Sequence, residues 1–277
     1  MSAPPLGTST ASAPSTAALD GWDTHVHIFD GAAQAQPGHY QPAHHPIDRI
    51  EAEAAGLGVG HLVLVQPSVY GTDNQLVLNA LRASGGRHRG VVVVDGNVQA
   101  AALQAMHALG VRGVRFNLVS PVGNGQDALP RLSGLLRELG WHLQWYARPE
   151  QLGQIADVHQ RTGLPCVLDH LAGLHTQLPA RDAAWDALQR LAGAGAWVKL
   201  SGWYRLGDHA PYIRITEHIQ RVATIAPGRL VWGSDWPHTA FDAAAMPAYR
   251  SVWTPVEDAL GTSRAHEVLR AGARLYG

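Results

Sequence analysis

The chain has 277 residues, of which 46% are hydrophobic and 16% are charged, and its formal net charge is −1. A near-neutral chain without a basic run lacks the electrostatic signature of nucleic-acid binding, and no apolar stretch is long enough to cross a bilayer. From this charge balance and hydropathy we expect neither a nucleic-acid nor a membrane partner. The single cysteine, Cys166, excludes an intrachain disulfide and fits a cytoplasmic protein.

The first 19 residues are rich in Ser, Thr, Ala and Pro and contain no charged side chain. An export signal would need a basic start and an apolar middle, and both are missing here. We therefore expect residues 1–19 to be a disordered tail. We expect residues 20–277 to form one domain, because barrels of the α/β class often have this length.

Apolar runs with the length of buried strands recur along the chain and alternate with segments of helical periodicity. The predicted strands are 22–28, 61–66, 90–95, 111–117, 142–146, 165–170, 197–201 and 230–235. The predicted helices are 75–83, 101–109, 129–139, 150–161, 185–191, 215–225 and 263–275. Gly110, Gly140 and Gly163 follow three of these helices, where a left-handed residue commonly ends a helix, and Pro149 suits a first helical position.

This alternation implies parallel strands joined by right-handed crossovers. Eight such units predict a (β/α)8 TIM barrel of the α/β class. The alternative is a doubly wound open sheet. We disfavour it because polar residues follow the first, middle and last strands alike, and only a closed barrel brings all of these strand ends to one mouth.

The first strand ends with two histidines, His25 and His27. Alternate side chains of a strand share a face, so both rings should point into one space. Their chemistry there is either metal ligation or polarisation of a substrate oxygen. Because buried polar groups without partners are costly, we interpret the pair as functional. Isolated histidines elsewhere are interpreted as surface or packing residues.

Other strand ends carry charged side chains. Asp235 follows the last apolar strand, and a buried carboxylate needs a partner or a catalytic task. Arg115 either closes a structural ion pair or holds an anionic substrate group. Lys199 lies within its strand, where an internal salt bridge explains it at least as well as catalysis. The remaining polar residues at these ends include Gln66, Ser68, Asn117, Tyr146, Asp169, His170, Ser201, Arg205 and His238.

Several motifs occur in a fixed order along the chain. They are DTHVH (23–27), VQPSVYGTDN (65–74), GVRFN (113–117), LDHLA (168–172), KLSG (199–202) and GSDWPH (233–238). Together they resemble the amidohydrolase superfamily, and specifically the branch that contains 2-pyrone-4,6-dicarboxylate lactonase and related sugar-lactone hydrolases. The resemblance covers about residues 20–277 and implies a barrel that binds a lactone at its mouth.

The resemblance also implies roles for individual residues. His25, His27 and His170 would surround the lactone carbonyl, and Asp235 would act as the general base on water. The expected substrate-binding residues are Ser68, Arg115 and Arg205, the loop residue Tyr40, and the strand-end residues Tyr146 and Asn117.

One position departs from the pattern of that branch. The pyrone dicarboxylate lactonase has a second arginine six residues after the arginine of the RFN motif, and this chain has Pro121 there. Proline cannot form a bidentate pair with a carboxylate, so a second carboxylate would need another partner such as Arg148. We therefore expect a lactone with one carboxylate, or a sugar lactone.

The sequence bears on metal binding as well. The superfamily's binuclear members bridge two metals through a modified lysine or a glutamate at the end of the fourth strand, where Arg115 and Asn117 stand here. One zinc ion held by His25, His27, His170 and Asp235 is chemically possible. The branch includes metal-independent lactonases, and hydrogen bonds can stabilise the oxyanion of an activated ester. We therefore favour hydrolysis without a cofactor, with one divalent cation as the alternative.

The ligand expected from these residues is a small-molecule lactone or sugar acid. Lactone isomerisation without net hydrolysis, metal-dependent decarboxylation and binding of a sugar acid without turnover are the alternative functions. A homo-oligomer is compatible with the sequence, which carries no clear signature of an oligomer surface.

Overall fold

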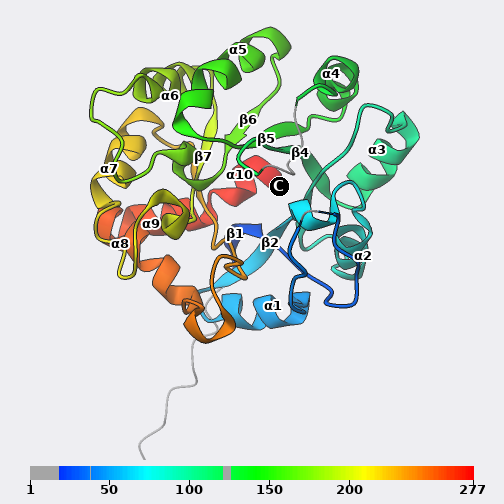
Figure 1. Ribbon diagram of the computed structural model, residues 1–277, viewed down its shortest axis with the longest axis horizontal. Helices are drawn as coiled ribbons and strands as arrows, with labels where there is room; N and C mark the ends of the chain where they lie inside the picture. Colours follow the sequence, from blue (N-terminus) through cyan, green and yellow to red (C-terminus); the bar gives the residue numbers. More distant parts are fainter. Residues whose placement is uncertain (1–18, 38, 121–125) are drawn as a thin grey trace, which may run out of the picture.

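The computed structural model describes residues 19–37, 39–120 and 126–277 (Figure 1). Its strands pair in parallel, in sequence order, as one eight-stranded sheet. They are β1 (Gly21–Val26), β2 (Val59–Val65), β3 (Arg89–Val92), β4 (Val111–Asn117), β5 (His142–Tyr146), β6 (Cys166–Leu168), β7 (Trp197–Leu200) and β8 (Leu230–Trp232). A parallel bridge between Val26 and Trp236 joins the first strand to the segment that follows the last strand. The predicted (β/α)8 TIM barrel is confirmed.

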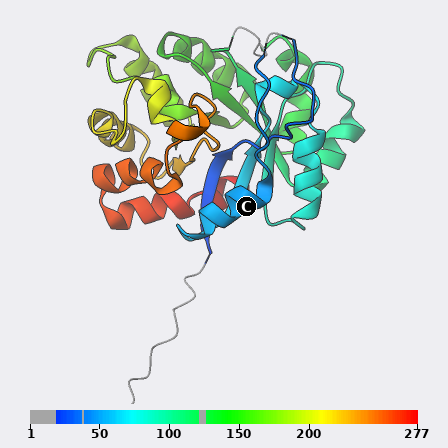
Figure 2. The same cartoon turned by 60° about the horizontal axis from the view of Figure 1, so that its bottom comes forward.

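Helices surround the strands on the outside, as Figure 2 shows from the side. They are α1 (Ile47–Ala55), α2 (Gln75–Ala83), α3 (Ala100–Ala108), α4 (Leu129–Glu138), α5 (Leu152–Thr162), α6 (Ala183–Gly193), α7 (Thr216–Ile225), α8 (Thr254–Leu260) and α9 (Thr262–Arg270), and they are followed by α10 (Gly272–Tyr276), which lies at one end of the barrel. The spacing of apolar residues explains the packing: in α5, Leu152, Ile155 and Val158 are buried because positions three or four apart share one helix face.

The last helix covers the barrel at the end where the strands begin. Tyr276 of α10 is buried, stacks on Trp22 near the start of β1 and meets His142 at the start of β5 edge-on. Gly272 allows this approach, since a Cβ there would lie 2.4 Å from the Cβ of Trp22. The floor is thereby filled, and the opposite end of the barrel is left for the site.

The observed elements differ from the predicted ones mainly at their ends. The predictions for β4, β5 and α2 match, while α1 and α8 were not predicted. Strands β6 and β8 end earlier than predicted because His170 (φ 49°) and Asp235 (φ 61°) leave the extended conformation. The predicted helix 263–275 is divided into α9 and α10. Gly110, Gly140 and Gly163 have the positive φ angles that were expected.

Two predictions fall outside the described residues: residues 1–18 of the expected tail, and Pro121. Among the helices that the structure describes, none combines the length and apolarity that a membrane span requires.

Candidate active site

His25 and His27 point into one space, as the strand alternation predicted. Their Nε2 atoms lie 3.3 Å apart, and both residues are buried. The Nδ1 of His27 lies 2.7 Å from the carbonyl oxygen of Val65 on β2. A carbonyl can only accept, so this Nδ1 carries the proton and Nε2 presents a lone pair. The Nδ1 of His25 is likewise turned to the Asp169 carboxylate, at 3.1 Å.

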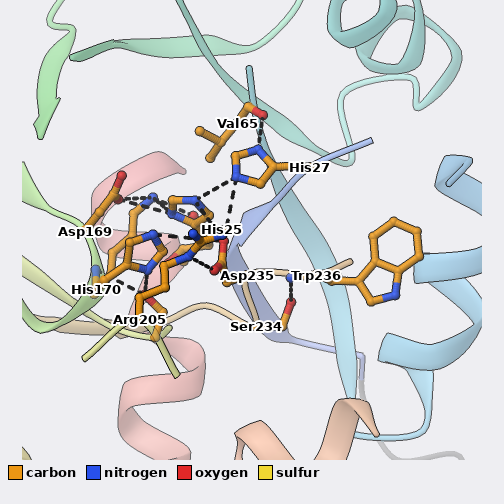
Figure 3. Close-up of polar contacts among 12 residues, drawn as sticks. His25, His27, Val65, Asp169, His170, Arg205, Ser234, Asp235 and Trp236 are labelled. Atoms are coloured by element: carbon orange, nitrogen blue, oxygen red, sulfur yellow. Dashed lines mark hydrogen bonds and ion pairs between the residues drawn. The ribbon is translucent and has the colours of Figure 1, made fainter. Parts of the chain in front are cut away.

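Asp235 lies opposite these rings, with its two oxygens in different surroundings (Figure 3). Its Oδ1 is 3.7 Å from Nε2 of His25, 3.7 Å from Nε2 of His27 and 4.0 Å from Nε2 of His170. Among the described residues this oxygen has no hydrogen-bond partner. Its Oδ2 accepts hydrogen bonds from the hydroxyl of Tyr204 (2.5 Å) and from Nε of Arg205 (2.6 Å).

The charges around Asp235 decide its protonation state. Burial raises the pKa of this carboxyl, but nearby positive charge, first of all the Arg205 guanidinium, holds the pKa well below its ordinary value. Burial lowers the pKa of His27 far below its ordinary value and that of His170 to about 3. The site therefore contains an ionised carboxylate facing neutral imidazoles.

Two glycines explain how the strand ends come this close. A Cβ on Gly233 would lie 2.5 Å from the Cβ of His25, and a Cβ on Gly202 would lie 2.4 Å from Nδ1 of His170. Any side chain at either position would force the neighbouring histidine out of place. The glycines of the KLSG and GSDWPH motifs are thus required by the close packing of the strand ends.

A second carboxylate, Asp169, lies beneath the histidines in a fully buried network. Its Oδ1 also lies 3.4 Å from Nζ of Lys199, and its Oδ2 accepts from Nε2 of Gln144 (3.1 Å) and lies 3.7 Å from Nε of Arg115. Lys199 further donates to Oε1 of Gln144 (2.8 Å). Lys199 therefore forms the internal salt bridge that the sequence suggested, and Arg115 takes part in the same network.

A cavity of about 240 Å³ opens at the barrel mouth above this cluster. All of the predicted substrate-binding residues line it, namely Tyr40, Ser68, Arg115, Asn117, Tyr146 and Arg205. The guanidinium groups of Arg115 and Arg205 lie 5.9 Å and 5.8 Å from the ring centre of Tyr146. The amide of Asn117 donates to Oγ of Ser68 (2.8 Å). His27 also lines the cavity and joins it to the buried cluster.

The structure adds residues to which the sequence assigned no role in the site. Asp169 had been noted only as a strand-end residue, and Gln144 and Tyr204 had not been singled out. A polar glutamine in the middle of an apolar strand was a usable signal for Gln144, since a buried amide needs partners. No sequence pattern marked Tyr204. Arg148, considered as a substitute carboxylate partner, is exposed and donates to the carbonyl of Val119 (3.4 Å).

The donor set fits a single divalent cation. Ligand atoms of His25, His170 and Asp235 all lie within 4.8 Å of one another, and the lone pair of His27 faces the same point. Zinc bonds to nitrogen of about 2.0–2.1 Å in a tetrahedron would separate ligand atoms by about 3.4 Å, close to the spacing found here. A second cation would be repelled by the Arg115 guanidinium.

The chain is similar to proteins of known family. The family described as Amidohydrolase matches residues 22–252. A 4-sulfomuconolactone hydrolase from Rhizobium radiobacter is 32% identical over 235 residues, which cover 82% of this chain and 79% of that protein. A 2-pyrone-4,6-dicarboxylate hydrolase from Comamonas testosteroni is 30% identical over 233 residues, covering 78% and 76%.

A solved structure agrees with these matches. A protein from Pseudomonas putida, described as a candidate 2-pyrone-4,6-dicarboxylic acid hydrolase, superposes with a TM-score of 0.83 at 29% identity. The superposition covers 94% of this chain and 98% of that chain.

Proposed function

This chain belongs to the amidohydrolase family, and from that premise we propose that it hydrolyses a lactone carrying an anionic group. The observation that carries the proposal is the Oδ1 of Asp235, which has no hydrogen-bond partner among the described residues and is buried among three histidines beneath a cavity with two guanidinium groups in its wall. The curated relatives are named as hydrolases of a sulfomuconolactone and of a pyrone dicarboxylate. A cyclic ester is the substrate class consistent with both observations.

The charge of the cavity supports an anionic substrate. Arg115 and Arg205 both line it, each with its guanidinium within 6 Å of the Tyr146 ring centre (5.9 Å and 5.8 Å), and a guanidinium pairs well with a carboxylate. Pro121, which lies outside the described residues, supplies no further cation to the site. A lactone with one carboxylate, or a hydroxylated sugar lactone, therefore suits the cavity better than a dicarboxylate.

In the proposed reaction, Asp235 accepts a proton at Oδ1 from a water molecule as that water attacks the lactone carbonyl carbon. The tetrahedral intermediate then collapses, the ring C–O bond breaks, and the leaving alkoxide or enolate takes up the proton that Asp235 received, which returns Asp235 to its ionised form. Arg115 and Arg205 hold the anionic group of the substrate. The fixed position of Asp235 relative to the cavity supplies the orientation that raises the rate.

The protonation state of the histidines is relevant to whether a metal cofactor polarises the lactone carbonyl. The Nε2 lone pair of His27 can accept a proton or ligate a cation, but it cannot donate to a carbonyl. One divalent cation held by His25, His27, His170 and Asp235 would supply Lewis-acid polarisation of that carbonyl. Metal-independent hydrolysis, which the sequence favoured, instead requires a proton on one of these histidines or donation from a neighbouring guanidinium.

The decisive experiment is a hydrolysis assay on a panel of carboxylated and sugar-acid lactones, read with a pH indicator and run with and without chelator. Ring opening with gain of one water supports the proposal. A product of unchanged mass indicates an isomerase, and carbon dioxide release abolished by chelator indicates a decarboxylase. Binding without any reaction indicates a non-catalytic barrel. Loss of hydrolysis on chelation, restored by zinc, would contradict metal independence.

We propose that the reaction takes place in the cytoplasm. The buried free thiol of Cys166 is consistent with a reducing compartment.

A further inference from the structure

The two oxygens of Asp235 are held unequally, and this asymmetry has a specific cause. Oδ2 receives both hydrogen bonds that the structure gives to the carboxylate, from Tyr204 and from Arg205. Oδ1 receives none from the described residues and faces the three histidines. Two donors on one oxygen stop the carboxylate from rotating, so the other oxygen has one fixed direction.

Tyr204 and Arg205 are adjacent in the short 3₁₀ turn Trp203–Leu206 that follows β7. Glycines in the left-handed conformation stand on both sides of this turn, Gly202 (φ 64°) and Gly207 (φ 76°). The tight turn lets two consecutive side chains converge on one carboxylate oxygen. Neighbouring positions in a strand could not do so, because their side chains point to opposite faces.

The ring of Tyr204 is itself well anchored. Phe241 meets it edge-on with ring centres 4.9 Å apart, His238 does so at 6.0 Å, and the guanidinium of Arg205 lies 5.1 Å from its centre. A tyrosine hydroxyl is protonated at neutral pH, because its ordinary pKa is about 10. The hydroxyl therefore keeps its proton and remains a donor.

We propose that Tyr204 is a positioning residue that fixes Asp235 by holding Oδ2, so that Oδ1 alone is presented to the reacting water. The inference rests on the proposed hydrolysis. A hydrogen bond of 2.5 Å from a neutral hydroxyl to a carboxylate is charge-assisted and strong. Asp235 also has φ 61°, an uncommon conformation for this residue type that surrounding contacts must maintain.

Tyr204 is better suited to this test than Arg205. Arg205 lines the cavity as well as binding Asp235, so its replacement would disturb substrate binding and the carboxylate together. Tyr204 is not among the residues found to line the cavity in the described part of the chain. Its removal should therefore change turnover without changing substrate binding.

The kinetic test is a double-mutant cycle with Tyr204→Phe, Asp235→Asn and the double variant, on a lactone that the enzyme opens. We expect Tyr204→Phe to lower kcat about tenfold, the scale of one lost charge-assisted hydrogen bond, with KM within about twofold of wild type. In the Asp235→Asn background the same change should have no further effect, because its effect acts through that carboxylate.

A matched control is Tyr249→Phe, which removes a buried hydroxyl that donates to Oδ2 of a different carboxylate, Asp23 (2.8 Å). It should lower kcat by less than about twofold, and its effect should be the same in both backgrounds, because its hydroxyl binds Asp23 and not Asp235. An equal loss from Tyr204→Phe in both backgrounds, or a loss seen in KM alone, would overturn the positioning role.

Crystal structures of the wild type and of Tyr204→Phe give a readout that needs no substrate. We expect Oδ1 of Asp235 to move by more than about 0.5 Å relative to the histidine Nε2 atoms, the tolerance of a productive site. An unmoved carboxylate would refute the inference even if no lactone were opened. A moved carboxylate in a protein that opens no lactone would refute the proposed function and leave the positioning intact.

Discussion

Asp235 and Asp169 are both buried and ionised, but their contacts give them different tasks. Both oxygens of Asp169 face donors, so it orients His25 and neutralises buried cations. Asp235 keeps one oxygen without a partner among the described residues, and that oxygen faces three histidines, of which His27 lines the cavity. At the scale of single residues, this oxygen without a partner among the described residues is the reason why we propose Asp235 as the proton acceptor.

Replacing Asp235 with asparagine tests the proton-accepting role. The amide keeps the size of the side chain but cannot act as a base, so kcat should fall roughly a hundredfold or more. Steady-state kinetics on an opened lactone measure this, with thermal denaturation to show that the variant is folded. Turnover close to wild type would remove Asp235 from the mechanism.

Replacing Asp169 with asparagine should mainly reduce stability. The change leaves the buried Lys199 and Arg115 without their anion, and breaking a buried pair costs about 3–5 kcal/mol. The control is Asp157→Asn, at an exposed pair with Arg190 (3.6 Å), where less than about 1 kcal/mol is expected. Urea denaturation measures both, and similar losses for the two variants would contradict the structural role of Asp169.

At the scale of elements, the contact between β1 and the segment that follows β8 determines the site. The backbone N–H of Asp235 donates to the carbonyl of His25 (2.9 Å), and that of His27 donates to the carbonyl of Trp236 (2.8 Å). These bonds close the barrel and also place the histidines against the carboxylate. The same backbone hydrogen bonds therefore close the barrel and bring the site residues together.

Gly233→Ala tests whether the site requires the close approach of Gly233 to His25. The new Cβ would lie 2.5 Å from the Cβ of His25 and 3.0 Å from its backbone nitrogen, so β1 or β8 must shift. We expect a loss of about 1–3 kcal/mol in the free energy of unfolding, typical of overpacking, together with reduced kcat.

The control for Gly233→Ala is Gly134→Ala in α4, where nothing lies within 4 Å of the new Cβ. Alanine favours a helix over glycine by about 1 kcal/mol, so this variant should be unchanged or more stable. If both variants behaved alike in urea denaturation and kinetics, the close approach at Gly233 would not matter.

The sequence predicted some elements closely for identifiable reasons. Strands β4 and β5 are buried except at Arg112 and Tyr146, and the predicted helix 75–83 coincides with α2. Helix α1 was not predicted, because only Ile50 and Ala54 of its residues are buried and its apolar stripe is narrow. Strands β6 and β8 end early, and they are followed by His170 and Asp235 in the left-handed conformation. Residues other than glycine adopt this conformation only rarely, so the sequence did not predict it.

At the scale of the whole molecule, the barrel interior holds histidines in the neutral form. Burial lowers the pKa of His142 to about 3, and it also lowers the pKa values of His25, His27 and His170. In the unfolded chain a histidine takes up its proton near pH 6.5. Between about pH 6.5 and pH 3 the unfolded state therefore binds more protons, and stability must fall as the pH falls.

His142→Gln tests this linkage away from the cavity. Removing one such histidine should reduce the pH dependence of the unfolding free energy between pH 6 and pH 4 by up to about 1.4 kcal/mol per pH unit. His266→Gln, at an exposed position of α9, should leave the slope unchanged. Urea denaturation at several pH values measures both, and an unchanged slope for His142→Gln would show that its ring is not kept neutral by burial.

The sequence by itself determined the barrel class, the shared direction of His25 and His27, and the strand-end positions of the residues around the cavity. These follow from local rules, since strand alternation and helical periodicity depend on neighbours in the chain. Only the tertiary structure decided that Tyr204 donates to Oδ2 of Asp235 and not to Oδ1. It also decided that Lys199 and Gln144 bind Asp169. Those pairings join segments far apart in the chain, and they depend on strand register and barrel closure.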